Sequence, residues 1–315
     1  MKLLFLGSPT VAVPFLEECV RNGHEICAVV TQPDRPSGRG MALSPPPVKE
    51  AAMKRGLRIL QPEKMADVRA ELESFQADVA IVVAFGRMLG PKTLGTTRLG
   101  FLNVHFSLLP EYRGAAPVQR ALMDGKKKSG VTLFWIVKEM DAGPIQRRAE
   151  IDVPVTEDAP ELFKRLIELG VCELRAVLSD LSLGKVVREE QAGEPSFAPK
   201  IESSEARLSF ELSAAEFHNK VRGLRGGPKA YLWLSLPGKD APTRLTVLKT
   251  LPEKEAEGEP GRLVSVDEER GILVQCRLSR CWITDVQPEG KKPVKAVDFL
   301  NGARLKQGDR LITAV

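Results

Sequence analysis

A chain of 315 residues is long enough for two domains, each with a hydrophobic core of its own. Its composition, 43% hydrophobic and 28% charged, is that of an ordinary globular protein. The first apolar run, residues 3–6, is too short for a secretory leader, and no run is long enough to cross a membrane. The five cysteines are scattered and match no zinc spacing, so the sequence predicts reduced thiols in a cytoplasmic protein.

The net charge of +5 is unevenly distributed along the chain. Residues 206–315 hold 19 Lys/Arg and 14 Asp/Glu, so this last third carries the whole excess. A basic accessory domain suits a polyanionic partner. On charge alone, however, a chance surplus on a solvated surface is the favoured interpretation.

The first half of the chain alternates apolar strands with helical patterns. Residues 2–6 form the first predicted strand, and a Gly-Ser-Pro turn leads into a helical pattern of Phe15, Leu16, Cys19 and Val20. A β-branched strand at 26–31, a Pro-rich loop at 33–47 and a helix near 48–55 follow. Further buried strands are predicted at 79–84, 100–105 and 131–137. This order indicates a Rossmann-like, mostly parallel sheet with helices on both faces.

The last third has a different pattern. The first domain is predicted to end at residue 183, and a polar, aperiodic linker covers 184–205. The second domain, 206–315, begins with an amphipathic helix at 214–224. Short strands bounded by turn signals then predict a small, OB-like β-barrel; they lie at 231–236, 244–250, 261–266, 272–277 and 282–286. The basic turn at 126–128 is predicted to be a solvated loop rather than a binding site.

Two polar side chains end the strand predicted at 100–105. Asn103 and His105 are two residues apart, so on a strand they share one face. They also lie at the carboxyl end of a parallel strand, where open α/β sheets place their ligands. An amide beside an imidazole can donate hydrogen bonds to one developing oxyanion. Capping of loop backbone is an equally good interpretation of the pair alone.

A carboxylate follows the next predicted strand, in the segment Glu139-Met140-Asp141-Ala142-Gly143-Pro144. Asp141 at a strand end can reach His105 on a neighbouring strand, and its charge would raise the pKa of that histidine. For this segment alone, a plain Asp-Ala-Gly turn is the favoured interpretation.

Together these segments resemble the folate-dependent formyltransferase family. The resemblance is carried by Asn-x-His-x-Ser-Leu-Leu-Pro at 103–110, Arg-Gly-Ala-Ala-Pro at 113–117 and the turn at 141–143, and it extends over most of the chain. It implies transfer of a formyl group from 10-formyltetrahydrofolate to the α-amino group of methionine on initiator tRNA, for translation initiation. The implied catalytic residues are Asn103, His105 and Asp141. Asn103 and protonated His105 would donate to the formyl oxygen, while Asp141 keeps His105 charged and takes the amine proton.

The resemblance also implies two binding surfaces and no metal. The folate would lie against Phe85, Gly86, Met88, Leu89, Ser107, Leu108, Leu109, Pro110, Met140 and Gly143. The tRNA would contact Arg35, Arg39, Arg304, Lys306 and Arg310. In the Pro-rich loop at 33–47, Met41-Ala42-Leu43 stands where family members commonly carry lysines. The sequence therefore leaves open whether this part of the loop contacts the tRNA phosphates. The protein is expected to be a monomer.

Other functions fit parts of this pattern. A formyltransferase that acts on a sugar-nucleotide amine shares the region at 113–117 and is the main competitor. A hydrolase of formyltetrahydrofolate uses the same trio, Asn103, His105 and Asp141, with water as the acceptor. An enzyme that formylates a purine precursor needs no second domain of this kind. An RNA-binding protein with an inactive α/β domain would not need an intact trio. No Gly-x-Gly-x-x-Gly follows the first strand, so nicotinamide binding is not supported.

Overall fold

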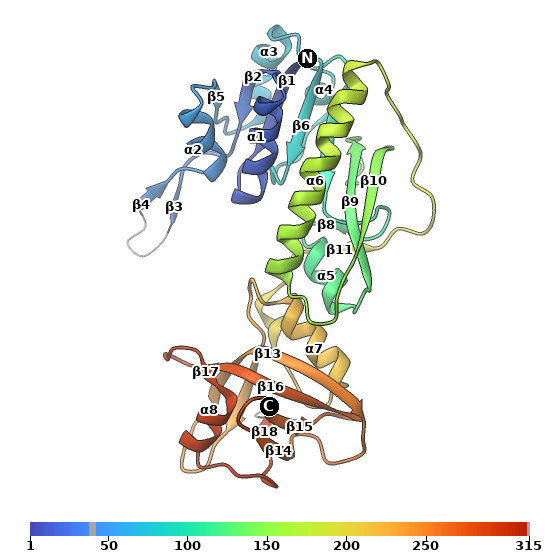
Figure 1. The fold of residues 1–315 in the computed structure, drawn as a ribbon. Coiled ribbons are helices and arrows are strands. Elements are labelled where there is room, and N and C mark those ends of the chain that lie inside the picture. The colour runs from blue at the N-terminus through green and yellow to red at the C-terminus, as the bar shows by residue number, and fades with distance from the viewer. Residues whose placement is uncertain (38–41, 314–315) are drawn as a thin grey trace. The chain divides into compact units, whose positions relative to one another are not determined.

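The computed structural model describes residues 1–37 and 42–313. The chain forms two compact units (Figure 1). The first unit comprises residues 1–114, 129–151 and 164–197, and the second comprises 115–128, 152–163 and 198–315. The chain therefore enters the second unit three times. The sequence, in contrast, predicts a single crossing between the domains, through the linker at 184–205. The predicted functional domain boundaries stay predictions.

Within the described residues, the first unit is built on a seven-stranded sheet with the order β10-β9-β7-β6-β1-β2-β5. The strands are β1 (Lys2–Gly7), β2 (Glu25–Val30), β5 (Ile59–Leu60), β6 (Val79–Val83), β7 (Phe101–His105), β9 (Lys128–Trp135) and β10 (Ile145–Asp152). The pairs from β5 across to β7 are parallel, whereas β7 and β9 are antiparallel. The predicted mostly parallel, Rossmann-like sheet is confirmed.

Helices cover both faces of this sheet because its central strands are apolar on both sides. Leu4 and Leu6 of β1 share a core with α3 (Met65–Ser74) on one face. On the other face α1 (Val13–Arg21) lies beside α6 (Ala159–Ser182), and the fully buried carboxylate of Glu18 accepts a hydrogen bond from Arg175 (Figure 1). Each fully buried leucine stabilises the fold by roughly 1.5–3 kcal/mol.

The Pro-rich segment, which the sequence predicts as a loop, contains strands among its described residues. It carries two short strands, β3 (Arg35–Ser37) and β4 (Ala42–Ser44), which pair antiparallel. At the base of this hairpin, the Asp34 carboxylate accepts hydrogen bonds from Lys49 of α2 (Pro47–Lys54) at 2.7 and 2.9 Å and from Gln61 at 2.8 Å. These side-chain anchors fix the hairpin, and no periodic pattern in the sequence reports them.

Several further elements are short. In the first unit they are η1 (Thr10–Ala12), α4 (Pro91–Leu94) and β8 (Arg113–Gly114), and β8 pairs with β11 (Phe197–Ala198). In the second unit they are α5 (Pro117–Met123), η2 (Ser203–Ala206), β17 (Val294–Lys295) and α8 (Ala296–Gly302). No helix within the described ranges combines the length and the apolar character that spanning a bilayer requires.

The second unit is a small β-barrel. Its strands follow the order β14-β15-β16-β13-β12-β18, and β17 also pairs with β16. They are β12 (Tyr231–Ser235), β13 (Thr243–Glu255), β14 (Leu263–Asp267), β15 (Gly271–Gln275), β16 (Ser279–Pro288) and β18 (Ile312–Thr313). The two ends of this order meet, because Leu263 N donates to Asp309 O and Leu311 N donates to Gly261 O, both at 2.8 Å. The predicted barrel is confirmed.

Helix α7 (Ala214–Gly223) packs against this barrel with one face and presents polar side chains on the other. Its start is fixed by a capping box, in which Ser213 Oγ accepts from Glu216 N and Ser213 N donates to Glu216. Such a cap contributes about 1 kcal/mol. Phe217 and Val221 join the barrel core, and Phe217 stacks on Phe210 with ring centroids 5.7 Å apart.

Candidate functional site

His105 ends β7 with one ring nitrogen already engaged. The ring is 6% exposed, and its Nε2 lies 2.9 Å from the carbonyl oxygen of Tyr112. A carbonyl only accepts, so Nε2 carries a hydrogen and donates it. The other nitrogen, Nδ1, lies 3.9 Å from Oδ2 of Asp141. Nδ1 is therefore the nitrogen of His105 that can exchange a proton.

Burial has the largest influence on the pKa of His105. Desolvation lowers the pKa of His105 below its usual value, while the Asp141 carboxylate raises that pKa and offsets part of the shift. The edge of the Phe134 ring, 6.3 Å away between centroids, contributes to this apolar setting. The predicted effect of Asp141 on the pKa of His105 is correct in sign, and burial opposes it. That Asp141 keeps His105 charged stays a prediction. Burial favours the neutral ring, and because Nε2 carries the hydrogen, the lone pair of that neutral form is on Nδ1.

Asp141 lies in a turn that several hydrogen bonds hold in place. Its backbone has a φ of 50°, and its Oδ2 accepts from Gly114 N at 2.8 Å. The side-chain amide of Gln191 donates to the carbonyl oxygens of Asp141 and Gly143, both at 2.8 Å. Gln191 Oε1 in turn accepts from Arg113 Nη2 at 2.8 Å. Gln191 therefore ties the turn that carries Asp141 to strand β8.

Sequence reasoning missed Gln191. It lies in the polar, aperiodic stretch predicted as a linker, 50 residues beyond Asp141. Ser196 of the same stretch accepts a hydrogen bond from Tyr112 N at 2.9 Å. Part of the predicted linker thus packs against the site, and nothing in its composition distinguishes these two residues from their solvated neighbours.

Gly143 has a structural reason to be glycine. A Cβ at this position would lie 1.8 Å from the carbonyl oxygen of Trp135 in β9. Because that atom belongs to backbone, any side chain would push the turn away from the strand. Its predicted contact with folate stays a prediction.

Asn103 shares its face of the sheet with His105, as predicted. It lies opposite Val82 of β6 and Phe134 of β9, and its side chain is half-buried. Its amide makes no hydrogen bond with another described residue. The structure thus brings His105 and Asp141 together and leaves a free amide on the same face of β7. His105 and Asp141 thus meet at the carboxyl end of β7, Asn103 lies on the same face of that strand as His105, and the catalytic roles of all three stay predictions.

The predicted folate contacts surround this strand end. Phe85 and Leu89 follow β6 and are buried in the core that also contains Phe101, which lies on the face of Asn103. Met88 and Met140 are 75% and 60% exposed, so they leave apolar surface on both flanks. Gly86 has a φ of 73°, and an added Cβ there would lie 3.0 Å from the Gln32 amide.

The turn that follows His105 is braced by Thr132 of β9. Thr132 Oγ1 donates to Ser107 O at 2.7 Å and accepts from Leu109 N at 3.1 Å. Leu109 has no exposed surface, and the Ser107 hydroxyl donates to Glu111 O at 2.6 Å. Leu109 therefore supports the turn by packing. Leu108 and Pro110 complete this turn, and contact with a ligand stays a prediction for all four residues.

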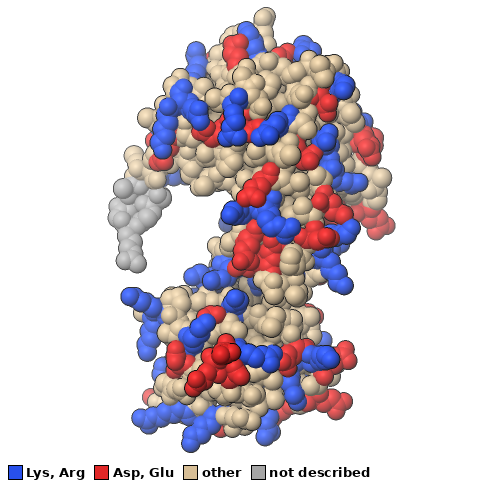
Figure 2. All heavy atoms as spheres, in the orientation of Figure 1, with Lys and Arg blue, Asp and Glu red and all other residues tan. Residues whose placement is uncertain are grey.

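The predicted tRNA contacts differ in how they are engaged. Arg35 begins β3 and is exposed, whereas Arg39 lies outside the described residues. Arg304 and Lys306 are exposed. Arg310 donates to Pro260 O at 3.0 Å and pairs with Glu259 at 2.5 Å, so it is held next to the barrel closure. On the visible surface, positive and negative side chains are interspersed rather than gathered by sign (Figure 2).

Comparison with known proteins identifies the class. Residues 1–178 match the family model described as formyl transferase, and residues 200–304 match the formyl transferase C-terminal domain. The chain belongs to the formyl transferase family. It is 42% identical to a methionyl-tRNA formyltransferase from Elusimicrobium minutum, over 98% of this chain and 99% of that one. The methionyl-tRNA formyltransferase of Bacillus subtilis (strain 168) is 35% identical, over 98% of this chain and 97% of its own length.

Solved structures share the fold at low sequence identity. HypX from Aquifex aeolicus, in complex with tetrahydrofolic acid, has a TM-score of 0.63 at 18% identity and covers 100% of this chain and 50% of its own. An N-formyltransferase from Helicobacter canadensis, in complex with folinic acid and dTDP-3-aminofucose, has a TM-score of 0.68 at 18% identity over 91% of this chain and 99% of its own.

Proposed function

We propose that this chain transfers the formyl group of 10-formyltetrahydrofolate to the α-amino group of methionine on initiator tRNA. The observation that carries the proposal is the meeting of His105 and Asp141, 3.9 Å apart, on the face of β7 that also bears Asn103. Likeness to methionyl-tRNA formyltransferases over 98% of the chain supports the acceptor.

The residues around the trio fit a folate. The exposed Met88 and Met140 offer apolar surface to a flat ring system, while Asn103 offers an amide that no described residue engages. These residues, with the segments at 85–89 and 107–110, would hold the co-substrate. When bound, 10-formyltetrahydrofolate supplies an activated formyl group for transfer to nitrogen.

The protein's own groups would then handle charge and protons. A free α-amino group has a pKa of about 7.7–8.0, and an ester lowers it, so a useful fraction of the attacking amine is neutral. Asn103 donates to the negative charge that develops on the formyl oxygen. His105 accepts the proton of the amine at Nδ1, because its Nε2 is engaged with Tyr112. Asp141 stabilises the imidazolium, which returns the proton to the leaving nitrogen.

A competition between acceptors tests this proposal. The formyl donor, isotopically labelled, is offered with methionylated initiator tRNA, methionylated elongator tRNA or a sugar-nucleotide amine. Label should appear on initiator tRNA far faster than on the other two. Label on the sugar amine, or release as formate without an acceptor, would refute the proposal. His105→Ala serves as the inactive control, with a melting curve to show that it folds.

We also propose that the enzyme works as a monomer in the cytoplasm. All five cysteines are free, and Cys19, Cys276 and Cys281 are buried, which suits a reducing compartment. Sedimentation at micromolar concentration tests the monomer, and a dimer would refute it.

A further inference from the structure

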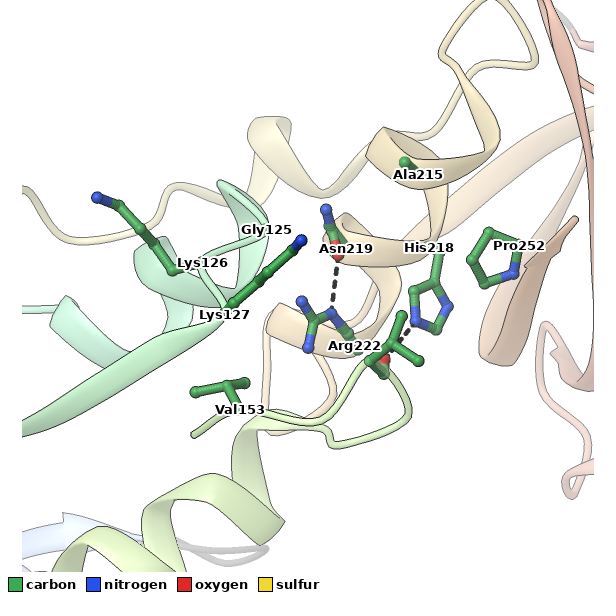
Figure 3. Close-up of a pocket in the computed structure, with 10 residues that line it drawn as sticks. Gly125, Lys126, Lys127, Val153, Ala215, His218, Asn219, Arg222 and Pro252 are labelled. Carbon is green, nitrogen blue, oxygen red and sulfur yellow. Dashed lines mark hydrogen bonds between the residues drawn. The ribbon is translucent and has the colours of Figure 1, made fainter. Parts of the chain in front are cut away.

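A pocket of about 320 Å³ lies within the second unit and includes none of the trio (Figure 3). It is formed where the basic turn after α5 faces the polar side of α7. Its lining includes Lys126, Lys127, His218, Asn219 and Arg222, and no acidic residue. This concentration of positive charge at one concave site has no part in the mechanism above.

Arg222 supplies a buried positive charge that only neutral groups hold directly. It is 6% exposed, its Nε donates to Asn219 Oδ1 at 2.8 Å, and its Nη1 lies 3.2 and 3.3 Å from the carbonyl oxygens of Pro154 and Glu157. Burial lowers the pKa of Arg222, and the charge of Glu157 opposes that shift without cancelling it. An additional anion would therefore stabilise this guanidinium.

Asn219 and Lys127 direct further donors to the same place. Because Asn219 Oδ1 is occupied by Arg222, the amide nitrogen points the other way, and a Cβ on Gly125 would lie 2.6 Å from it. Lys127 is exposed, and its ammonium group has no hydrogen bond or ion pair with a described residue. Figure 3 shows Lys127 extending toward Asn219 and Arg222, whereas Lys126 points away from them.

We propose that this pocket binds a phosphate group of the RNA backbone, between Lys127, Asn219 and Arg222. A guanidinium, an ammonium and an amide give a phosphate several hydrogen bonds, of which those from the charged groups are strong. Lys127 lines the pocket and is itself exposed to solvent, which suits one phosphate of a polymer crossing the surface. Identifying the phosphate as RNA rests on the proposed function. A free phosphorylated compound offers the same chemistry, and the experiment separates the two sources.

The first arm measures the affinity of the full chain for initiator tRNA at 50 and 200 mM salt. One lost phosphate contact reduces the salt slope by about 0.9, so the ratio of wild-type to Lys127→Ala affinity should fall about 3.5-fold between these concentrations. The control is Lys92→Ala, which removes an exposed lysine of α4 and should leave the slope unchanged. Asn219→Asp keeps the acceptor for Arg222 but replaces the amide donor with a negative charge, and it should weaken binding as well.

The second arm needs no tRNA and no turnover. Inorganic phosphate, added at constant ionic strength, is tested for binding to the wild type and to Lys127→Ala by the rise in melting temperature. A response that needs Lys127, together with the altered salt slope, supports the proposal. Such a response without a change in slope overturns the RNA assignment in favour of a free anion. No response and no change in slope overturn the site itself. Phosphate binding can be measured by this second arm even if the protein does not transfer formyl groups. Failure of the proposed function can therefore be distinguished from failure of the proposed phosphate site.

Discussion

Replacing Gln191 tests how far the catalytic site depends on the turn that carries Asp141. At an effective dielectric constant of about 20, unit charges 3.9 Å apart attract each other by about 4 kcal/mol. Without the two hydrogen bonds from Gln191 the turn can relax, and at a separation of about 6 Å the attraction falls to about 3 kcal/mol. Before rounding, the difference is about 1.5 kcal/mol, which is about one pKa unit, or about tenfold in rate. Gln191→Ala should therefore lower kcat about tenfold and lower the pKa of His105 by about one unit.

The measurement is kcat as a function of pH, with a melting curve for each variant. The proposed reaction needs neutral His105, so kcat rises with pH through the pKa of that residue. In Gln191→Ala this rise, the acidic limb of the pH profile, should shift to lower pH by about one unit. Gln191→Glu keeps the acceptor for Arg113 but removes both donors, so its kcat should fall similarly. Glu190→Ala, an exposed neighbour, should behave as wild type. A limb that stays in place or moves upward would refute the reasoning, even if kcat falls.

Three further predictions concern single contacts. Asn103→Ala should lower kcat about 10²–10³-fold, the usual cost of removing one donor to an oxyanion; near-normal turnover would remove Asn103 from the mechanism. Asp141→Asn should lower kcat and move the acidic limb to lower pH, because the carboxylate raises the pKa of His105; an upward move would contradict this. Hydrogen bonds from Arg120 and from the backbone of Glu202 lower the pKa of Glu205 from 4.5 to about 2, so the Arg120–Glu205 pair stabilises the protein above pH 4.5 and is lost as pH falls toward 2. Acid melts of Arg120→Ala should show a weaker pH dependence in that window, and an identical dependence would exclude the pair as its cause.

The core of the fold was predictable from the sequence because its strands are buried on both faces. The predicted strands at 79–84, a continuous apolar run, and at 100–105 coincide closely with β6 and β7. The strands β3 and β4 were not predicted, because they are fixed by the hydrogen bonds that Lys49 and Gln61 donate to the Asp34 carboxylate. Such anchors are tertiary, and the residues between them carry no alternating pattern.

The site was predictable where it depends on strand geometry. The period of two places Asn103 and His105 on one face wherever a strand forms. Two features of His105 were not predictable: its lowered pKa, which follows from burial, and the hydrogen bond of its Nε2 to the carbonyl of Tyr112, a residue with a φ of 61°. The role of Gln191 was also not predictable, since hydrogen bonds between residues 50 positions apart leave no local pattern in the sequence.

The repeated passage of the chain through the second unit limits how the barrel can be used as a module. His218 donates from Nε2 to Val155 O at 2.8 Å, and Arg222 depends on the carbonyls of Pro154 and Glu157. A fragment that starts near residue 200 would retain the imidazole and the guanidinium but lose the acceptors that satisfy them. Chimeras between family members joined at that point would inherit the same mismatch. A transplantable cassette must therefore also carry residues 115–128 and 152–163 from the same parent.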